Sequence, residues 1–217
     1  VRISLKQDVA AIPSARFSNR IRKIGLEDSL TPAFRQAVKA GSEQGKSGPS
    51  SSLSIDSPGQ EVLERTSMEV DARRVEARFA VGLPARGRTI LGRKAEAVLL
   101  QEVPGIARSA LCYESLDRSA LWRHICCCED QEAIRGQLAE RGLVAFVGNG
   151  SILPRQSGVS DKPLSEARFI PFSSPQELEV TFNLPHRGEV SGMGLRSGVT
   201  LIVGGGYHGK STLLKAL

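Results

Sequence analysis

Gly204-Gly205-Gly206-Tyr207-His208-Gly209-Lys210-Ser211 matches the pattern Gly-x-x-x-x-Gly-Lys-Ser/Thr, which is typical of phosphate-binding loops. The apolar run Val199–Val203 precedes this loop and predicts a strand, and Ser211–Leu217 is typical of the opening of a helix. Glycines between a strand and a helix let backbone N–H groups turn toward phosphate oxygens at the positive end of the helix. An ordinary glycine-rich turn is the alternative, but the predicted strand and helix on its two sides favour a phosphate site.

The loop predicts that the chain binds ATP together with Mg²⁺. Lys210 is expected to reach the β- and γ-phosphates, and the hydroxyl of Ser211 is expected to bind Mg²⁺. The predicted nucleotide-binding residues are Gly204, Gly205, Gly206, Tyr207, His208, Gly209, Lys210, Ser211 and Thr212. Phe182 and His186 are candidates for stacking on adenine, although an inward-facing strand position explains Phe182 equally well.

Positive charge is concentrated in the first part of the chain. The net charge is +6, and residues 1–100 carry 17 Lys and Arg against 11 Asp and Glu, whereas residues 101–217 carry 12 of each kind. Such an asymmetry favours either a polyanion partner or a solvated basic face. The densest cluster predicts a polyanion-binding surface made of Arg73, Arg74, Arg78, Arg86, Arg88 and Arg93. In a strand Arg74, Glu76 and Arg78 share one face, so Glu76 could instead neutralise its two neighbours.

Composition divides the chain into three segments. Residues 1–150 mix predicted strands and helices, residues 151–175 are rich in Pro, Gly and Ser and predict a linker, and residues 176–217 lead into the loop. A helix is predicted to start at Thr31-Pro32, because Thr suits a cap and Pro suits the first helical position. Further predicted elements are strands at 62–70, 75–81, 143–147 and 177–182, and helices at 89–103, 105–112, 117–127 and 130–140, the last closed by Gly142.

A second glycine-rich segment imitates a phosphate loop. Gly41–Ser47 is one residue short of the pattern, and Pro49 with the following serines forbids a helix after it, so a flexible loop is the favoured interpretation. The four cysteines form no Cys-x-x-Cys pair, which favours reduced thiols in an intracellular, soluble protein. No apolar run has the length of a membrane span. Because the chain starts with Val1 and stops within a predicted helix, we expect both ends to be cut.

Several strings of this sequence together resemble the predicted ATPases of the ABC class. They are Gly59–Ser67, Val81–Arg88, Glu129–Ala133, Leu143–Val147, Ser151–Asp161 and Gly198–Leu214. The resemblance covers most of the chain from about residue 12, and the string Gly-Gly-Gly-Tyr-His-Gly-Lys-Ser-Thr-Leu-Leu is unusual among phosphate loops. It implies an α/β fold, in which an α+β N-terminal domain precedes the first strands and P-loop of an ABC-type nucleotide-binding domain.

The resemblance also implies ATP hydrolysis by the intact protein, in a dimer or larger oligomer. The glutamine loop, signature segment, Walker B acidic pair and switch histidine of that family are missing here, so the fragment is expected to have no catalytic residue and to be inactive. One family member is linked to mitochondrial RNA editing, which implies RNA as a partner of the basic segment. Two alternatives stay open: an RNA-binding protein with a regulatory nucleotide site, and a P-loop kinase.

Overall fold

The structure is a computed structural model that describes residues 1–43, 52–57, 59–157, 160–164, 169–206 and 208–217. It confirms a mixed α/β fold, in which contacts divide the chain into an N-terminal unit, Val1–Cys128, and a C-terminal unit, Glu129–Leu217. One helix, α5 (Arg118–Leu138), contributes residues to both units. Most of the segment Gly41–Ser47, which imitates a phosphate loop, lies outside the described residues.

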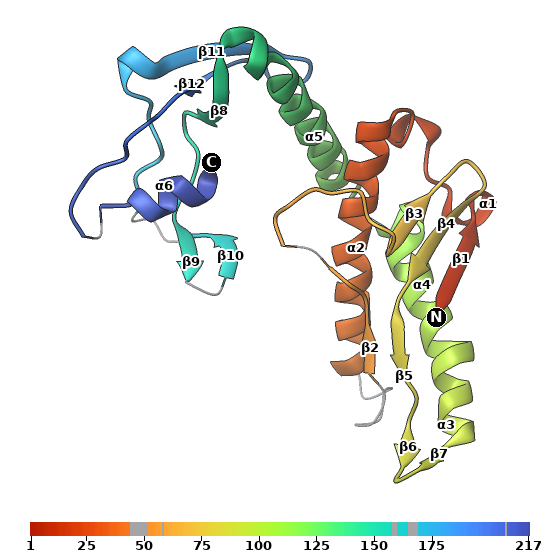
Figure 1. Cartoon of the computed structure of the whole chain (residues 1–217). Helices are drawn as coiled ribbons and strands as arrows, with labels where there is room; N and C mark the ends of the chain where they lie inside the picture. Colours follow the sequence, from red (N-terminus) through yellow and green to blue (C-terminus); the bar gives the residue numbers. More distant parts are fainter. Residues whose placement is uncertain (44–51, 58, 158–159, 165–168, 207) are drawn as a thin grey trace. The chain divides into compact units, whose positions relative to one another are not determined.

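The N-terminal unit is built around a small antiparallel sheet. Its strand order is β1-β4-β3, with β1 at Arg2–Lys6, β4 at Arg74–Arg78 and β3 at Met68–Val70. Helices α2 (Arg20–Glu43) and α4 (Val103–Leu111) pack against this sheet (Figure 1). Alternate strand residues point to the helices, so a core forms from Met68, Val70, Val75, Ala77, Leu26, Leu30, Phe34 and Leu111.

Shorter elements complete this unit. After β1 come α1 (Gln7–Ala10) and the 3₁₀ turn η1 (Ser14–Arg16). Two two-stranded ladders pair β2 (Ser52–Ser54) with β5 (Ala80–Gly82), and β6 (Ala85–Arg86) with β7 (Thr89–Ile90). A helical run then passes through α3 (Gly92–Ala97), the π-helical segment η2 (Val98–Glu102) and α4 to the 3₁₀ turn η3 (Tyr113–Ser115).

Helix α2 begins earlier than the sequence predicts, and this prediction was wrong. The side chain of Asn19 caps the helix by accepting the N–H of Arg22 at 2.8 Å. The hydroxyl of Thr31 donates to the carbonyl of Glu27 at 2.8 Å, and Pro32 lies inside the helix. An internal proline removes one helical hydrogen bond. Burial of Leu26, Leu30 and Phe34 on the same helix outweighs that loss.

The C-terminal unit holds a second antiparallel sheet, with strand order β11-β12-β8. These strands are Glu179–Leu184, Gly188–Arg196 and Leu143–Gly148. Their core residues, Leu143, Phe182 and Leu184, pack with Ile134 and Leu138 of α5. The unit also contains η4 (Ala139–Arg141), β9 (Arg155–Ser157), β10 (Ser160–Pro163), η5 (Gln176–Leu178) and α6 (Lys210–Ala216).

Helix α5 and strand β8 correspond to elements that the sequence predicts. The helices predicted at 117–127 and 130–140 are one continuous helix, which ends at Leu138. The 3₁₀ turn η4 follows it, and Gly142 closes that turn with φ 66°. Strand β8 pairs with β12, which groups residues 143–148 with the C-terminal unit. Contacts therefore divide the chain between Cys128 and Glu129, whereas composition changes in the segment 151–175. Strand β8 belongs to the C-terminal unit because β12 completes its backbone hydrogen bonds.

Candidate functional site

The glycine-rich loop lies directly before α6. Gly204 and Gly209 have φ values of 154° and 78°, in the region that favours glycine, and α6 starts at Lys210. A Cβ atom at Gly206 or Gly209 would meet nothing within 4 Å, so open space lies against the backbone there. Tyr207 lies outside the described residues. The loop thus offers exposed backbone beside a helix start, as a phosphate site requires.

Two side chains of the loop turn back onto its own backbone. The ammonium group of Lys210 donates a hydrogen bond to the carbonyl oxygen of Gly205. The N–H of Gly205 donates to Nδ1 of His208 at 3.2 Å. Ser211 is exposed and Thr212 is half-buried on the first turn of α6. Backbone N–H groups, an ammonium and a hydroxyl are a donor set that suits phosphate oxygens and Mg²⁺.

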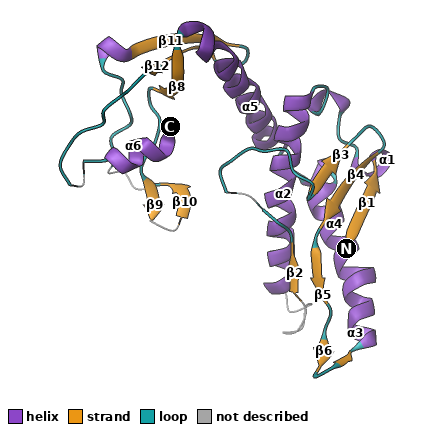
Figure 2. Cartoon of the chain, viewed as in Figure 1, coloured by secondary structure: helices purple, strands orange, loops and turns teal. Residues whose placement is uncertain are grey.

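The predicted strand before the loop is absent, and this prediction was wrong. No strand is assigned to residues 199–203, and Figure 2 draws the chain from β12 to the loop without one. Val199, Leu201 and Val203 are 103%, 81% and 75% exposed. A parallel strand of an α/β sheet is buried on both faces by neighbouring strands and helices. Within the described part of the chain no strand pairs with this run. Its β-branched residues therefore receive no stabilisation from strand hydrogen bonds or from packing in a sheet.

Neither candidate for adenine stacking presents a free ring. Phe182 is fully buried and packs edge-on against Phe146, with ring centroids 4.9 Å apart. The guanidinium of Arg141 lies 4.2 Å from the Phe182 centroid. The ring of His186 is bonded through Nε2 to a carboxylate oxygen of Glu129 at 2.8 Å. Phe182 is therefore a core residue of the C-terminal unit, in line with the inward-facing alternative.

The six arginines of the predicted polyanion surface fall into two groups. Arg78 lies 2.6 Å from Glu69 and 2.7 Å from Glu76, and Arg74 lies 3.3 Å from Glu76. Glu76 is buried beside these two guanidinium groups, so the charges of Arg74 and Arg78 are largely neutralised, which is the alternative that the strand pattern allowed. Arg73 is exposed beside Asp71, whose pKa is lowered mainly by the backbone N–H of Arg73. The remaining three, Arg86, Arg88 and Arg93, are exposed on the β6–β7 hairpin and α3.

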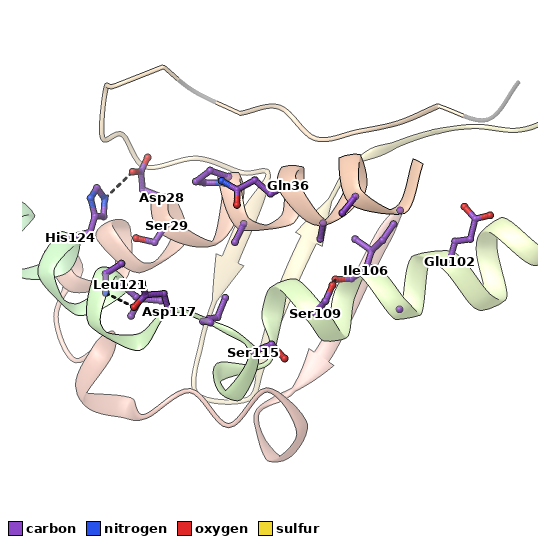
Figure 3. Close-up of a pocket in the computed structure, with 18 of the residues that line it drawn as sticks. Asp28, Ser29, Gln36, Glu102, Ile106, Ser109, Ser115, Asp117, Leu121 and His124 are labelled. Atoms are coloured by element: carbon purple, nitrogen blue, oxygen red, sulfur yellow. Dashed lines mark hydrogen bonds and ion pairs between the residues drawn. The ribbon is translucent and has the colours of Figure 1, made fainter. Parts of the chain in front are cut away.

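The N-terminal unit also contains a groove that the sequence did not indicate (Figure 3). It has a volume of about 1280 Å³ and lies between residues of α2, the α3–α4 run and α5. Small side chains such as Ala33, Ala37 and Gly105 form part of its wall. Asp28 and His124 lie together at one end, and Glu102 lies at the other.

The histidine at the end of this groove is held as a cation. His124 Nε2 lies 3.0 Å from a carboxylate oxygen of Asp28 and 3.7 Å from the sulfur of Cys128. The hydrogen bond to Asp28, followed by that to Cys128, raises the pKa of His124 from 6.5 to about 10. A protonated imidazole has no lone pair to accept a proton, so His124 does not serve as a general base at neutral pH.

Three further observations concern the thiols, the possible metal ligands and the length of the helices. All four cysteines are in the reduced form, and Cys112 and Cys128 are buried. Across the described residues no group of three or more His, Cys, Asp or Glu side chains is placed to hold a metal ion. No helix in the described ranges has the length and apolar character needed to cross a membrane.

Comparison with known proteins identifies two matching family models. Residues 1–114 match the model described as the N-terminal part of ATPases of the ABC class, and residues 117–217 match the P-loop domain of ABC ATPases. Together they cover both ends of the chain, and they meet just before α5. A search of curated proteins finds no match.

Proposed function

The chain belongs to the ATPases of the ABC class, and on this premise we propose that residues 204–212 form its site for ATP and Mg²⁺. A P-loop domain of this class implies nucleotide binding. The observation that carries the assignment to these residues is the exposed glycine backbone at the start of α6, with Lys210 and Ser211 on the first turn. Lys210 would exchange the Gly205 carbonyl for phosphate oxygens, and Ser211 would bind Mg²⁺.

The site can be tested by removing the ammonium group of Lys210. Lys210→Ala is expected to weaken binding of ATP·Mg²⁺ by about 2–3 kcal/mol, because a charged hydrogen-bond donor to phosphate is lost. Lys215→Ala is the matched control, since Lys215 is exposed on the same helix and lies outside the loop. Affinity is measured by titration with a fluorescent ATP analogue. Equal affinities for wild type and Lys210→Ala would rule out this site.

We also propose that nucleotide binding controls how the N-terminal unit engages a partner, and that the chain works as a dimer or larger oligomer. Helix α5 contributes residues to both units, which gives a continuous path along the chain between them. The exposed apolar run Val199–Val203 supports assembly, because unpaired apolar segments of this kind are commonly covered by another polypeptide. Sedimentation of the chain with and without ATP·Mg²⁺ tests the oligomeric state.

A second candidate function is polyanion binding by the N-terminal unit. It is supported by the excess charge of residues 1–100 and by the exposed positions of Arg86, Arg88 and Arg93. Gly87 has φ 61° and forms the turn between Arg86 and Arg88, so both side chains are carried at the tip of a hairpin. Long side chains at such a tip can reach phosphate groups of a bound strand. Binding of a single-stranded oligonucleotide across a salt series tests this function: Arg86→Ala/Arg88→Ala is expected to flatten the slope of log affinity against log salt by about one to two, and an unchanged slope would contradict it.

A further inference from the structure

The imidazole ring of His208 lies against the first glycines of the loop at 204–212. The backbone N–H of Gly205 donates a hydrogen bond to Nδ1 of this ring at 3.2 Å. A Cβ atom placed on Gly204 would lie 3.6 Å from the Cβ and Nδ1 atoms of His208, and one placed on Gly205 would lie 3.1 Å from its Cε1 atom. The ring therefore covers the backbone of two successive glycines and joins the first half of the loop to the second.

The same glycine is held from its other side by Lys210. The ammonium group of Lys210 donates a hydrogen bond to the carbonyl oxygen of Gly205. Both polar backbone groups of Gly205 are thus bonded to side chains from the second half of the loop. A Cβ atom on Gly206 or Gly209, by contrast, would meet nothing within 4 Å. The loop is therefore fixed at one residue, while the backbone beside that residue is open.

A run of glycines needs such a contact if it is to bind a ligand tightly. Gly204, Gly205 and Gly206 follow one another, and glycine loses more conformational freedom on becoming ordered than any other residue. A loop that is already held in its binding conformation spares the ligand this entropic cost. When Lys210 turns to the phosphates, the hydrogen bond to His208 is the contact that still holds Gly205.

We propose that His208 is a positioning residue of the phosphate site: through Gly205 its ring holds the glycine run in the conformation that leaves the neighbouring backbone open to phosphate. This inference rests on the proposed ATP site at residues 204–212. The loop pattern assigns no role to this side chain, because His208 stands at one of its four unspecified positions. Since the N–H of Gly205 is the donor, Nδ1 carries no proton and the ring proton is on Nε2.

Two substitutions separate the hydrogen bond from the bulk of the ring. His208→Leu keeps a branched side chain and removes the acceptor, whereas His208→Asn keeps an acceptor, because Oδ1 of Asn and Nδ1 of His are both bonded to Cγ. His208→Leu is expected to weaken binding of ATP·Mg²⁺ and ADP·Mg²⁺ by the same factor, roughly threefold to tenfold, the effect of one net hydrogen bond. His208→Asn is expected to restore the affinity of the wild type to within about twofold.

Affinities are measured with the complete 217-residue chain by titration with fluorescent analogues of ATP and ADP. Thermal melts should coincide for the three proteins, because His208 is exposed and lies outside the core of the C-terminal unit. If His208→Leu melts below the wild type, His208→Ala takes its place and is expected to give the same loss. Long-range ¹H–¹⁵N spectra of the nucleotide-free wild type should show the ring proton of His208 on Nε2, and a proton on Nδ1 would overturn the proposal.

Lys210→Ala separates a failure of this inference from a failure of the ATP site. If Lys210→Ala weakens binding and the His208 variants bind as the wild type does, the site stands and the positioning role is wrong. Tighter binding by His208→Leu would mean that the ring competes with phosphate, and a loss limited to ATP would mean that it touches the terminal phosphate. Either result would overturn the proposal, as would equal losses in His208→Leu and His208→Asn. No nucleotide binding by the wild type would remove both the site and this inference.

Discussion

Glu27 is a buried carboxylate that ties α2 to the sheet of the N-terminal unit. Its Oε1 atom accepts the backbone N–H of Val70 at 2.8 Å, and the ammonium of Lys23 lies 3.7 Å away. Burial raises the pKa of Glu27 from 4.5 to about 7, against the opposing effects of Val70 and Lys23. Between pH 4.5 and 7 the folded chain therefore keeps a proton that the unfolded chain releases. Stability contributed by this group is lost as the pH rises through that window.

Replacing this carboxylate by an amide should stabilise the protein above neutral pH. Glu27→Gln keeps an oxygen acceptor for Val70 and removes the buried charge, so we expect a gain of about 1–3 kcal/mol at pH 8. Below pH 4.5 the two proteins should have equal stability. Urea unfolding at both pH values measures the difference, and the exposed Glu61→Gln serves as a control with little effect. A less stable Glu27→Gln at pH 8 would show that the Lys23 pair outweighs burial.

Strand β12 shows how one glycine permits the close approach of neighbouring strands. Gly192 pairs with Val180 of β11 and with Gly148 of β8. A Cβ atom at this position would lie 2.2 Å from the carbonyl oxygen of Val147 and 2.7 Å from the Cα of Gly148. Backbone atoms cannot move aside as a side chain can, so the central strand accepts no side chain there.

Two glycine substitutions should have opposite effects on the stability of the chain. Gly192→Ala is expected to destabilise it by about 1–3 kcal/mol, because the β8–β12 pairing must shift to avoid the clash. Gly136→Ala is the matched control: Gly136 lies within α5, and a Cβ atom there meets nothing within 4 Å. That substitution should stabilise the helix by about 0.5–1 kcal/mol. Thermal melts followed by circular dichroism distinguish the two, and a neutral Gly192→Ala would contradict the strand spacing.

At the scale of the whole molecule, we propose that these 217 residues bind ATP without supplying the acidic groups that hydrolysis needs. P-loop ATPases use an acidic residue to hold Mg²⁺ and a further polar or acidic group to orient the attacking water. In this sequence no Asp or Glu follows Glu189, so none comes after the loop. The carboxylate of Glu129 is bonded to His186, and Asp130 accepts the backbone N–H groups of His186 and Arg187 at 3.0 and 3.2 Å.

We therefore expect the 217-residue chain to bind ATP·Mg²⁺ and to release no phosphate above background. A coupled phosphate assay over a range of ATP concentrations measures turnover, with Lys210→Ala as the control for contaminating activity. Phosphate release by the wild type that Lys210→Ala abolishes would show that the chain supplies catalytic groups we have not identified. The binding test of Lys210→Ala separates this outcome from a failure of the nucleotide site itself.

Local patterns in the sequence predicted those features that depend on neighbouring residues along the chain. Apolar periodicity and glycine placement predict the helical segments near 89–112 and 117–140, the closing of the turn η4 by Gly142, and the strand β8. The glycine-rich loop with a helix after it follows from the spacing of Gly204, Gly209 and Lys210. Conformational preferences and hydrogen bonds within a few residues fix such features, so a short window of sequence contains the necessary information.

Features that depend on residues far apart in the sequence could be recognised only in the tertiary structure. The start of α2 depends on burial of its apolar side against the sheet, and the run Val199–Val203 lacks a paired strand among the described residues. Neutralisation of Arg78 needs Glu69 from another strand. The stack of Arg16 on Trp122 joins residues that are more than 100 positions apart. Burial and charge pairing act through space, so no local pattern records which side chains will meet.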